Sequence, residues 1–158
     1  MGFDSLDAVL YTTGRRLRRA GLAADVTAVA TVNIFTVAGG PVVLNGIAGA
    51  VTTVIGAAAG TTIQLNHTPV APAAATVLCL ASAAITNAVV GTVFTITGAV
   101  GVAMTVNANG IGIYQLTQRL VLLPGIMGLV VAVLANTGVI DWYLDYTPLT
   151  AAATVTAL

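Results

Sequence analysis

The feature that most constrains the fold of this chain is its uncharged middle, because no Asp, Glu, Lys or Arg occurs between Val26 and Gln118. Only 6% of the 158 residues are charged, whereas an ordinary soluble domain has about 25%. A free monomer would present mostly Ala, Thr, Val and Gly to water, and a formal net charge of zero would do little to keep copies apart. We therefore expect lipid or other protein subunits to cover much of the surface.

A membrane protein is the first of these alternatives. The segment Thr76–Phe94 is apolar enough to score as a spanning helix on a hydropathy scale. However, Val, Thr and Ala dominate the segment, Asn87 lies near its centre, and no Trp or Tyr flanks it, and these features favour strands. A second apolar run, Leu120–Leu134, is short and is interrupted by Pro124-Gly125. A small holin-like integral membrane protein stays open as an alternative, but a membrane is not the partner we expect.

The first 25 residues differ from the rest of the chain. Apolar residues recur at helical spacing from Phe3 to Leu17, Asp4 can cap a helix, and Gly21 can end it. The sequence therefore predicts a short N-terminal amphipathic helical arm over residues 1–25.

A cluster of arginines lies in this arm, and each guanidinium can bind carboxylates or phosphates in a bidentate manner. The cluster consists of Arg15, Arg16, Arg18 and Arg19. Three interpretations fit it: a solvated basic helix face, docking on an acidic protein surface, and contact with nucleic acid or anionic lipid.

The remainder, residues 26–158, has the pattern of one β-rich domain. Turn signals recur about every 8 to 12 residues, and the segments between them favour Val, Ile and Thr, which is typical of an all-β sandwich or barrel. We predict a β-sandwich or a jelly-roll-like barrel, with a bulge at Asn45-Gly46 or at Gly49. The predicted strands are 31–37, 42–55, 61–68, 76–85, 92–97, 100–106, 119–123, 128–134 and 139–146, with a tight turn at 107–110 and loops at 57–60 and 71–75.

The last of these strands alternates most clearly. Its even-numbered residues, Ile140 to Tyr146, share one face, and Asp141 and Asp145 lie on the opposite face. We expect the aspartate face to be polar and to meet solvent or an interface. The candidate anchors of the core or of an oligomer are the large side chains Phe35, Phe94, Trp142, Leu144 and Tyr146.

Titratable groups for catalysis are scarce. The single histidine, His67, has no carboxylate near it in sequence and is expected to be a partly exposed residue at a strand end. Asp141 and Asp145 would stand about 13 Å apart along a strand, too far for two carboxylates that act on one bond. One His and one Cys offer no zinc-like ligand spacing, and Cys79 is expected to be a buried small hydrophobe. We therefore expect no enzyme, no catalytic, cofactor-binding or metal-binding residue, and no small-molecule substrate.

The distinctive segments of the chain, in order, are IFTVAGGPVVLNGIAGAVTTVI (34–55), TVLCLASAAITNAVVGTVFTITG (76–98), LVLLPG (120–125) and GVIDWYLDYTPL (138–149). Together they resemble a family of small virion proteins of tailed bacteriophages, which are head-associated, decoration-like components. The resemblance implies an oligomeric, threefold, β-rich cap or cement on a capsid lattice. A tail or head-to-tail structural component is the alternative within the virion.

The partners that the resemblance implies are the major capsid protein and further copies of the chain in a homotrimer. The residues Arg15, Arg16, Arg18 and Arg19 would then contact an acidic patch on the shell or on a neighbouring subunit. Nucleic acid is disfavoured because Arg119 is the only basic side chain in the β region. The start of the chain, Met1-Gly2-Phe3-Asp4, lacks a positively charged leader, so we expect synthesis in the host cytoplasm and residence in the virion.

Overall fold

The computed structural model of the chain describes residues 14–27, 30–56, 59–133, 135 and 137–158. In these residues strands predominate and one short helix occurs. The elements are β1 (Arg15–Arg19), α2 (Ala24–Thr27), β2 (Thr31–Ala38), β3 (Val42–Thr53), β4 (Ile63–Pro69), β5 (Thr76–Val77), β6 (Val93–Thr95), β7 (Thr105–Asn107), β8 (Gln115–Leu122), β9 (Gly125–Val131), β10 (Val139–Pro148) and β11 (Thr154–Ala157).

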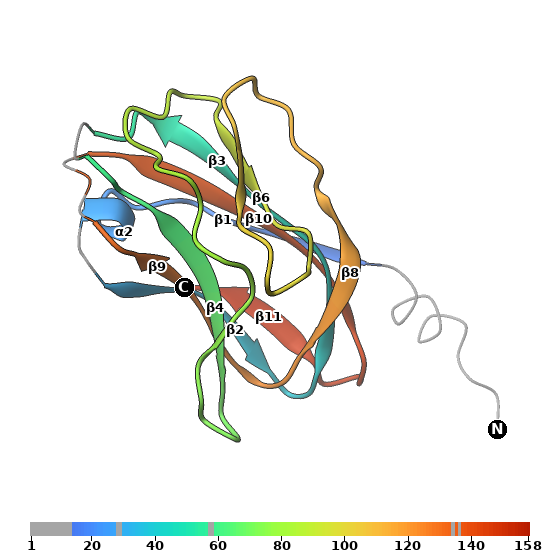
Figure 1. Ribbon diagram of the computed structural model, residues 1–158. Coiled ribbons are helices and arrows are strands. Elements are labelled where there is room, and N and C mark those ends of the chain that lie inside the picture. The colour runs from blue at the N-terminus through green and yellow to red at the C-terminus, as the bar shows by residue number, and fades with distance from the viewer. Residues whose placement is uncertain (1–13, 28–29, 57–58, 134, 136) are drawn as a thin grey trace, which may run out of the picture.

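The strands form two antiparallel sheets that lie face to face (Figure 1). One sheet has the order β1-β10-β3-β6-β7, with β8 pairing to the part of β3 that β6 leaves free. The other has the order β11-β2-β9-β4-β5. The chain alternates between the sheets, since β2, β4, β9 and β11 lie in one and β3, β8 and β10 lie in the other. The predicted all-β fold is confirmed, and its architecture is a β-sandwich.

A single hydrophobic core fills the space between the sheets. Strand β10 shows why, because its alternating apolar residues Ile140, Trp142, Leu144 and Tyr146 are all buried, as predicted for this face. Phe35 of β2 and Phe94 of β6 are fully buried as well. The five candidate anchors therefore belong to the core, where large apolar surfaces contribute most to folding.

Strand β3 carries the predicted irregularity at Asn45. Gly46 pairs with Asp145 and Leu44 pairs with Tyr146, so Asn45 is the extra residue of a bulge. No such shift occurs at Gly49, the other predicted position. Gly49 instead makes room for the core, because a Cβ there would lie 2.9 Å from the Trp142 ring.

The helix predicted through the arginine cluster is wrong, because Arg15–Arg19 form strand β1 at the edge of the first sheet. The same five residues also alternate with a period of two, which places Arg16 and Arg18 on one face and Leu17 on the other. Pairing with the long strand β10 satisfies the backbone groups on one side of β1 and selects the strand. The rest of the predicted arm, residues 1–13, lies outside the described residues.

Two predicted strands are much shorter than expected. Of 76–85 only Thr76–Val77 is a strand, and of 100–106 only Thr105–Val106 belongs to one, β7. From Leu78 onward the chain follows β4 through widely spaced hydrogen bonds, from Leu78 N to Leu65 O, Ser82 N to Ile63 O and Ile85 N to Thr61 O. The residues of this segment are small and do not alternate between polar and apolar, so their side chains would stabilise a continuous strand only weakly. Cys79 is buried, as predicted.

Strand β11 was not predicted. Its four residues, Thr154–Ala157, pair with the edge of β2 and bury Val155. Elsewhere, the segment Thr76–Phe94 contains no helix, and no helix in the described part of the chain is long and apolar enough to cross a membrane.

Candidate functional site

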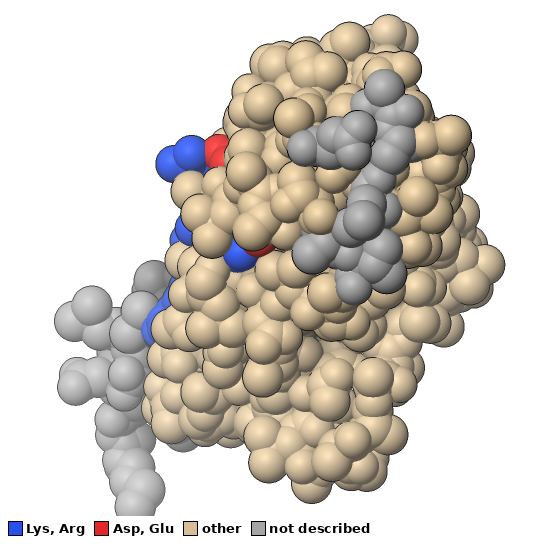
Figure 2. All heavy atoms as spheres, turned by 90° about the vertical axis from the view of Figure 1, so that its left-hand side faces the viewer, with Lys and Arg blue, Asp and Glu red and all other residues tan. Residues whose placement is uncertain are grey.

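Most of the charged side chains of the described residues lie close together, with Arg119 on β8 apart from them. In Figure 2 the charged side chains lie along one margin of the molecule, and the rest of the visible described surface is uncharged. The cause is the topology, because β1 brings its arginines beside β10, which carries Asp141 and Asp145. The outer face of the sheet at β1, β10 and β3 is therefore the most polar surface that the described residues form.

The residues of this face are set by the strand register. Arg16 pairs with Asp145, which pairs with Gly46, and Arg18 pairs with Tyr143, which pairs with Ala48. The two rows lie side by side on the face that points away from the core. Because Gly46 and Ala48 of β3 are small, the neighbouring tyrosine and arginine side chains project above this part of the sheet.

A hollow of about 490 Å³ lies over these rows. It is lined by Arg16, Leu17, Arg18, Ala48, Tyr114 and Tyr143, and we call it the Arg–Tyr hollow. Tyr114 forms a wall beside Gly46, where an added Cβ would lie 3.0 Å from the ring. A hollow with guanidinium and phenol groups suits a ligand that combines carboxylates with apolar surface.

The two arginines of the hollow differ in their pairing. Arg18 Nη2 lies 2.5 Å from Asp141 Oδ2 and Nε donates to the same oxygen at 3.1 Å. The hydrogen bond to Asp141 raises the pKa of Arg18. Burial alone would raise the pKa of Asp141, but the Gly21 N–H and the Arg18 guanidinium hold it below its usual value. Arg16 is exposed and takes part in neither salt bridge found among the described residues.

The phenol of Tyr114 is electrostatically coupled to this face. Burial raises its pKa to about 12, helped by the negative charge of Asp145 and opposed by the positive charge of Arg16. Tyr114 therefore stays a neutral hydrogen-bonding group over the whole physiological range. It was not among the predicted site residues, and its loop position gave no sequence signal for this role.

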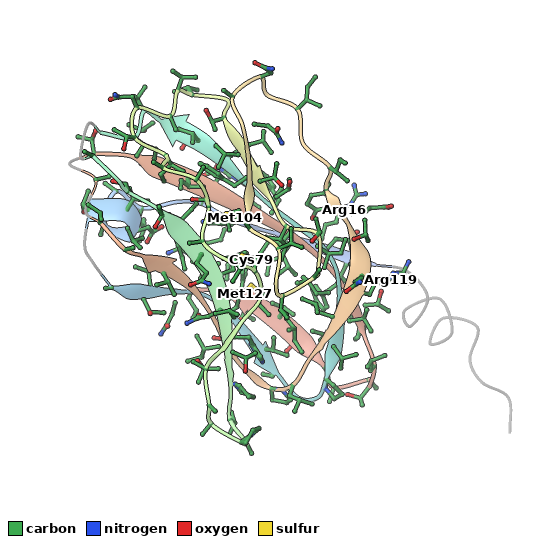
Figure 3. The ribbon with its side chains drawn as sticks, in the orientation of Figure 1. Arg16, Cys79, Met104, Arg119 and Met127 are labelled. Carbon is green, nitrogen blue, oxygen red and sulfur yellow. The ribbon has the colours of Figure 1, made fainter. Side chains whose placement is uncertain are left out.

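The four arginines predicted to be contact residues differ in how far they are exposed. Arg16 and Arg18 are exposed and Arg15 is partly exposed, but Arg19 is buried in an ion pair with Asp25. The prediction of Arg19 as a surface contact is therefore wrong, because its guanidinium is used inside the fold. Figure 3 shows Arg16 and Arg119 on the outside of the sandwich, whereas Cys79, Met104 and Met127 gather in its middle.

The aspartate face is only partly as predicted. Asp141 is buried, with 5% of its surface exposed, rather than facing solvent, because Arg18 and the Gly21 N–H cover it. Asp145 is partly buried, and its Oδ1 has no hydrogen-bond partner among the described residues.

His67 is not the partly exposed residue that was predicted, since it is buried in β4 with 6% of its surface exposed. Its Nε2 lies 3.0 Å from the Leu123 carbonyl oxygen, so the ring donates there and ties β4 to the turn before β9. Burial lowers the pKa of His67. Within the described residues no three His, Cys or Asp side chains come close enough together to hold a metal ion.

Outside the charged face, apolar side chains reach the surface in several places. Ile111 and Ile113, between β7 and β8, are each 76% exposed and border a hollow of about 360 Å³. A second apolar groove, of about 230 Å³, lies between β8 and the β4–β5 edge, where Val77, Val121 and Leu123 are exposed. Among the residues that the structure describes, no Asp or Arg lines either hollow.

Comparison of the chain with protein-family models, with curated proteins and with solved structures gave no match.

Proposed function

We propose that this protein is a structural component of a tailed-phage particle, a decoration, cement or minor capsid protein that binds the head shell and stabilises it without catalysis. The observation that carries the proposal is the surface formed by the described residues, which is partly apolar and carries few charges, most of them on β1 and β10 and one, Arg119, on β8. Such a surface suits a protein that works surrounded by other subunits. The segments that resemble small phage virion proteins support the same role.

The apolar faces would contact the shell. Ile111, Ile113 and the groove at the β4–β5 edge offer neutral surfaces that bury without leaving a charge unpaired. Repetition over a symmetric lattice multiplies a modest contact per copy. The proposed partners are the major capsid protein and further copies of the chain, in a trimer.

The test is cosedimentation of the full chain with heads and, separately, tails of the phage that encodes it. We expect saturable binding to heads, at a repeating number of copies measured by mass spectrometry, and release of DNA from the decorated heads at a higher temperature. Binding to tails alone would favour the tail alternative. A chain that stays monodisperse only in detergent would favour the membrane alternative, and failure to bind either fraction would contradict a virion role.

A matched pair of variants tests the surface. Ile111→Asn with Ile113→Asn removes the most exposed apolar pair, and Leu22→Asn changes a leucine that is 58% exposed and lines neither hollow. We expect the first variant to weaken head binding by about tenfold or more, which corresponds to about 1.4 kcal/mol or more. The control should bind nearly as the wild type does.

A further inference from the structure

The charges of the chain divide unequally between its described part and residues 1–13. All five arginines lie in the described part, but only Asp25, Asp141 and Asp145 of the five aspartates do. Asp4 and Asp7 lie within residues 1–13, which contain no Lys or Arg. The described part therefore carries two excess positive charges, and the segment that precedes it carries two negative ones.

The two excess positive charges are the balance of Arg15, Arg16 and Arg119 against Asp145, and part of this charge lies where a ligand can reach it. Arg19 is held inside the fold by Asp25, and Arg18 is paired with Asp141. Arg16 remains exposed in the Arg–Tyr hollow without a salt bridge to the described residues. An acidic segment would gain a charge-assisted hydrogen bond there, in a site partly shielded by two tyrosine rings.

The chemistry of residues 1–13 fits the rest of the hollow as well. Phe3, Leu6 and Leu10 accompany the two aspartates. The lining of the hollow is similarly mixed, with Ala48 and the rings of Tyr114 and Tyr143 next to the arginines. A segment that alternates carboxylates with apolar side chains therefore matches this surface in both charge and hydrophobicity.

The length of residues 1–13 is enough to reach a neighbouring copy. The hollow extends forward along β1 from Arg16 to Arg18, away in sequence from the residues that precede Gly14. Thirteen residues can extend over about 45 Å, which exceeds the radius of a domain of this size.

We propose that residues 1–13 of one copy dock in the Arg–Tyr hollow of a neighbouring copy, with Asp4 or Asp7 bound to Arg16. Each copy offers one segment and one hollow, so reciprocal or cyclic exchange closes an oligomer without unused sites. The contact forms between free copies of the chain and does not require a capsid.

A charge-swap experiment on the full chain tests the exchange. One variant carries Asp4→Arg and Asp7→Arg, and the other carries Arg16→Asp. Each variant alone places like charges at the contact, whereas an equimolar mixture restores opposite charges in both directions. Molar mass is measured by sedimentation velocity for the wild type, each variant and the mixture, with far-ultraviolet circular dichroism to verify folding.

We expect the wild type to associate, each variant to associate at least about tenfold more weakly, and the mixture to recover association. Arg119→Asp is the matched control, because it makes the same charge change at an exposed arginine outside the hollow. It should keep the wild-type mass, and in a mixture with the Asp4→Arg, Asp7→Arg variant it should behave as the wild type does in the same mixture.

Three results would overturn the exchange: a monomeric wild type, variants that keep the wild-type mass, or a mixture that fails to recover association. The last result would place the segment in the hollow of its own copy. Since no particle is present, these outcomes are separate from the binding to heads that tests the proposed function.

Discussion

Arg19 and Asp25 form a buried ion pair, with only 4% and 2% of their side-chain surfaces exposed. Arg19 Nη2 donates to Asp25 Oδ1 at 3.0 Å, and Nη1 donates to Oδ2. The same carboxylate accepts the Leu22 N–H at 2.9 Å, and Arg19 Nε donates to the Leu158 carbonyl at 2.8 Å. The pair therefore fastens β1 to α2 and to the segment after β11.

Arg19→Met should destabilise the protein strongly, because the carboxylate of Asp25 would stay buried without its cation. The expected loss in the free energy of unfolding is about 3–5 kcal/mol. Urea denaturation followed by circular dichroism measures it.

Arg18→Met is the control for this variant, since it makes the same change one residue earlier in β1. The side chain of Arg18 is 59% exposed, so its pair with Asp141 is screened by solvent. The midpoint of unfolding should move much less than in Arg19→Met. Equal shifts in the two variants would show that burial does not determine how much each ion pair contributes to the stability of the fold.

Trp142→Ala should also cost about 3–5 kcal/mol, because the indole is 1% exposed and its loss leaves a cavity between the sheets. Thermal unfolding measures the effect. Tyr143→Ala removes the next aromatic side chain of β10, which is 39% exposed on the outer face, and should lower the melting temperature far less. A melting temperature of Trp142→Ala close to that of the wild type would contradict the central place of this residue in the core.

The strands of the sandwich were predictable from the sequence where the residue pattern fitted a strand and did not also fit a helix. The residues of β10 alternate without competition, and their inward face is as expected. In β1 the arginine–leucine pattern fitted both a helix and a strand, and only the free edge of β10 decides between them. The stretch after Val77 was overpredicted because its β-favouring residues lack the alternation that a continuous ladder needs.

The candidate site was predictable in part. The arginine cluster identified the right surface, but the separate roles of its members depend on Asp141, 123 residues away from Arg18. Pairing over such a distance follows from the sheet order and leaves no local pattern. Tyr114 belongs to the hollow for the same reason, since Gly46 of β3 leaves space for its ring.

The raised pKa of Tyr114 predicts a loss of stability in alkali. Its folded pKa is about 12, caused first by burial and then by Asp145, whereas an unfolded tyrosine has a pKa of about 10. The unfolded chain releases its proton first, so the free energy of unfolding should fall as the pH rises from about 10 to 12. Urea denaturation over this range, for the wild type and for Tyr114→Phe, should show a steeper decline in the wild type.

Asp145→Asn checks the second cause. Removing the negative charge should bring the pKa of Tyr114 down toward its ordinary value, as seen in the ultraviolet absorbance of tyrosinate against Tyr114→Phe. An unchanged titration would leave burial as the sole cause.

The buried His67 predicts the opposite dependence in weak acid. Burial lowers its pKa in the folded protein, so the unfolded chain binds the proton more readily as the pH falls through about 6.5. Stability is full above this pH and declines below it, by at most about 1.4 kcal/mol per pH unit. The pKa of Asp141 is held below its usual value, so its contribution is lost only at more acidic pH.

Urea denaturation between about pH 7.5 and 5 separates these groups, because His67 is the only histidine in the chain. His67→Asn removes the titrating ring, and its lower stability should stay nearly constant over this range. Leu123 accepts the ring hydrogen bond through its backbone carbonyl, so the variant also loses the tie between β4 and the turn before β9. A wild-type curve as flat as that of the variant would mean that the ring is protonated equally in both states.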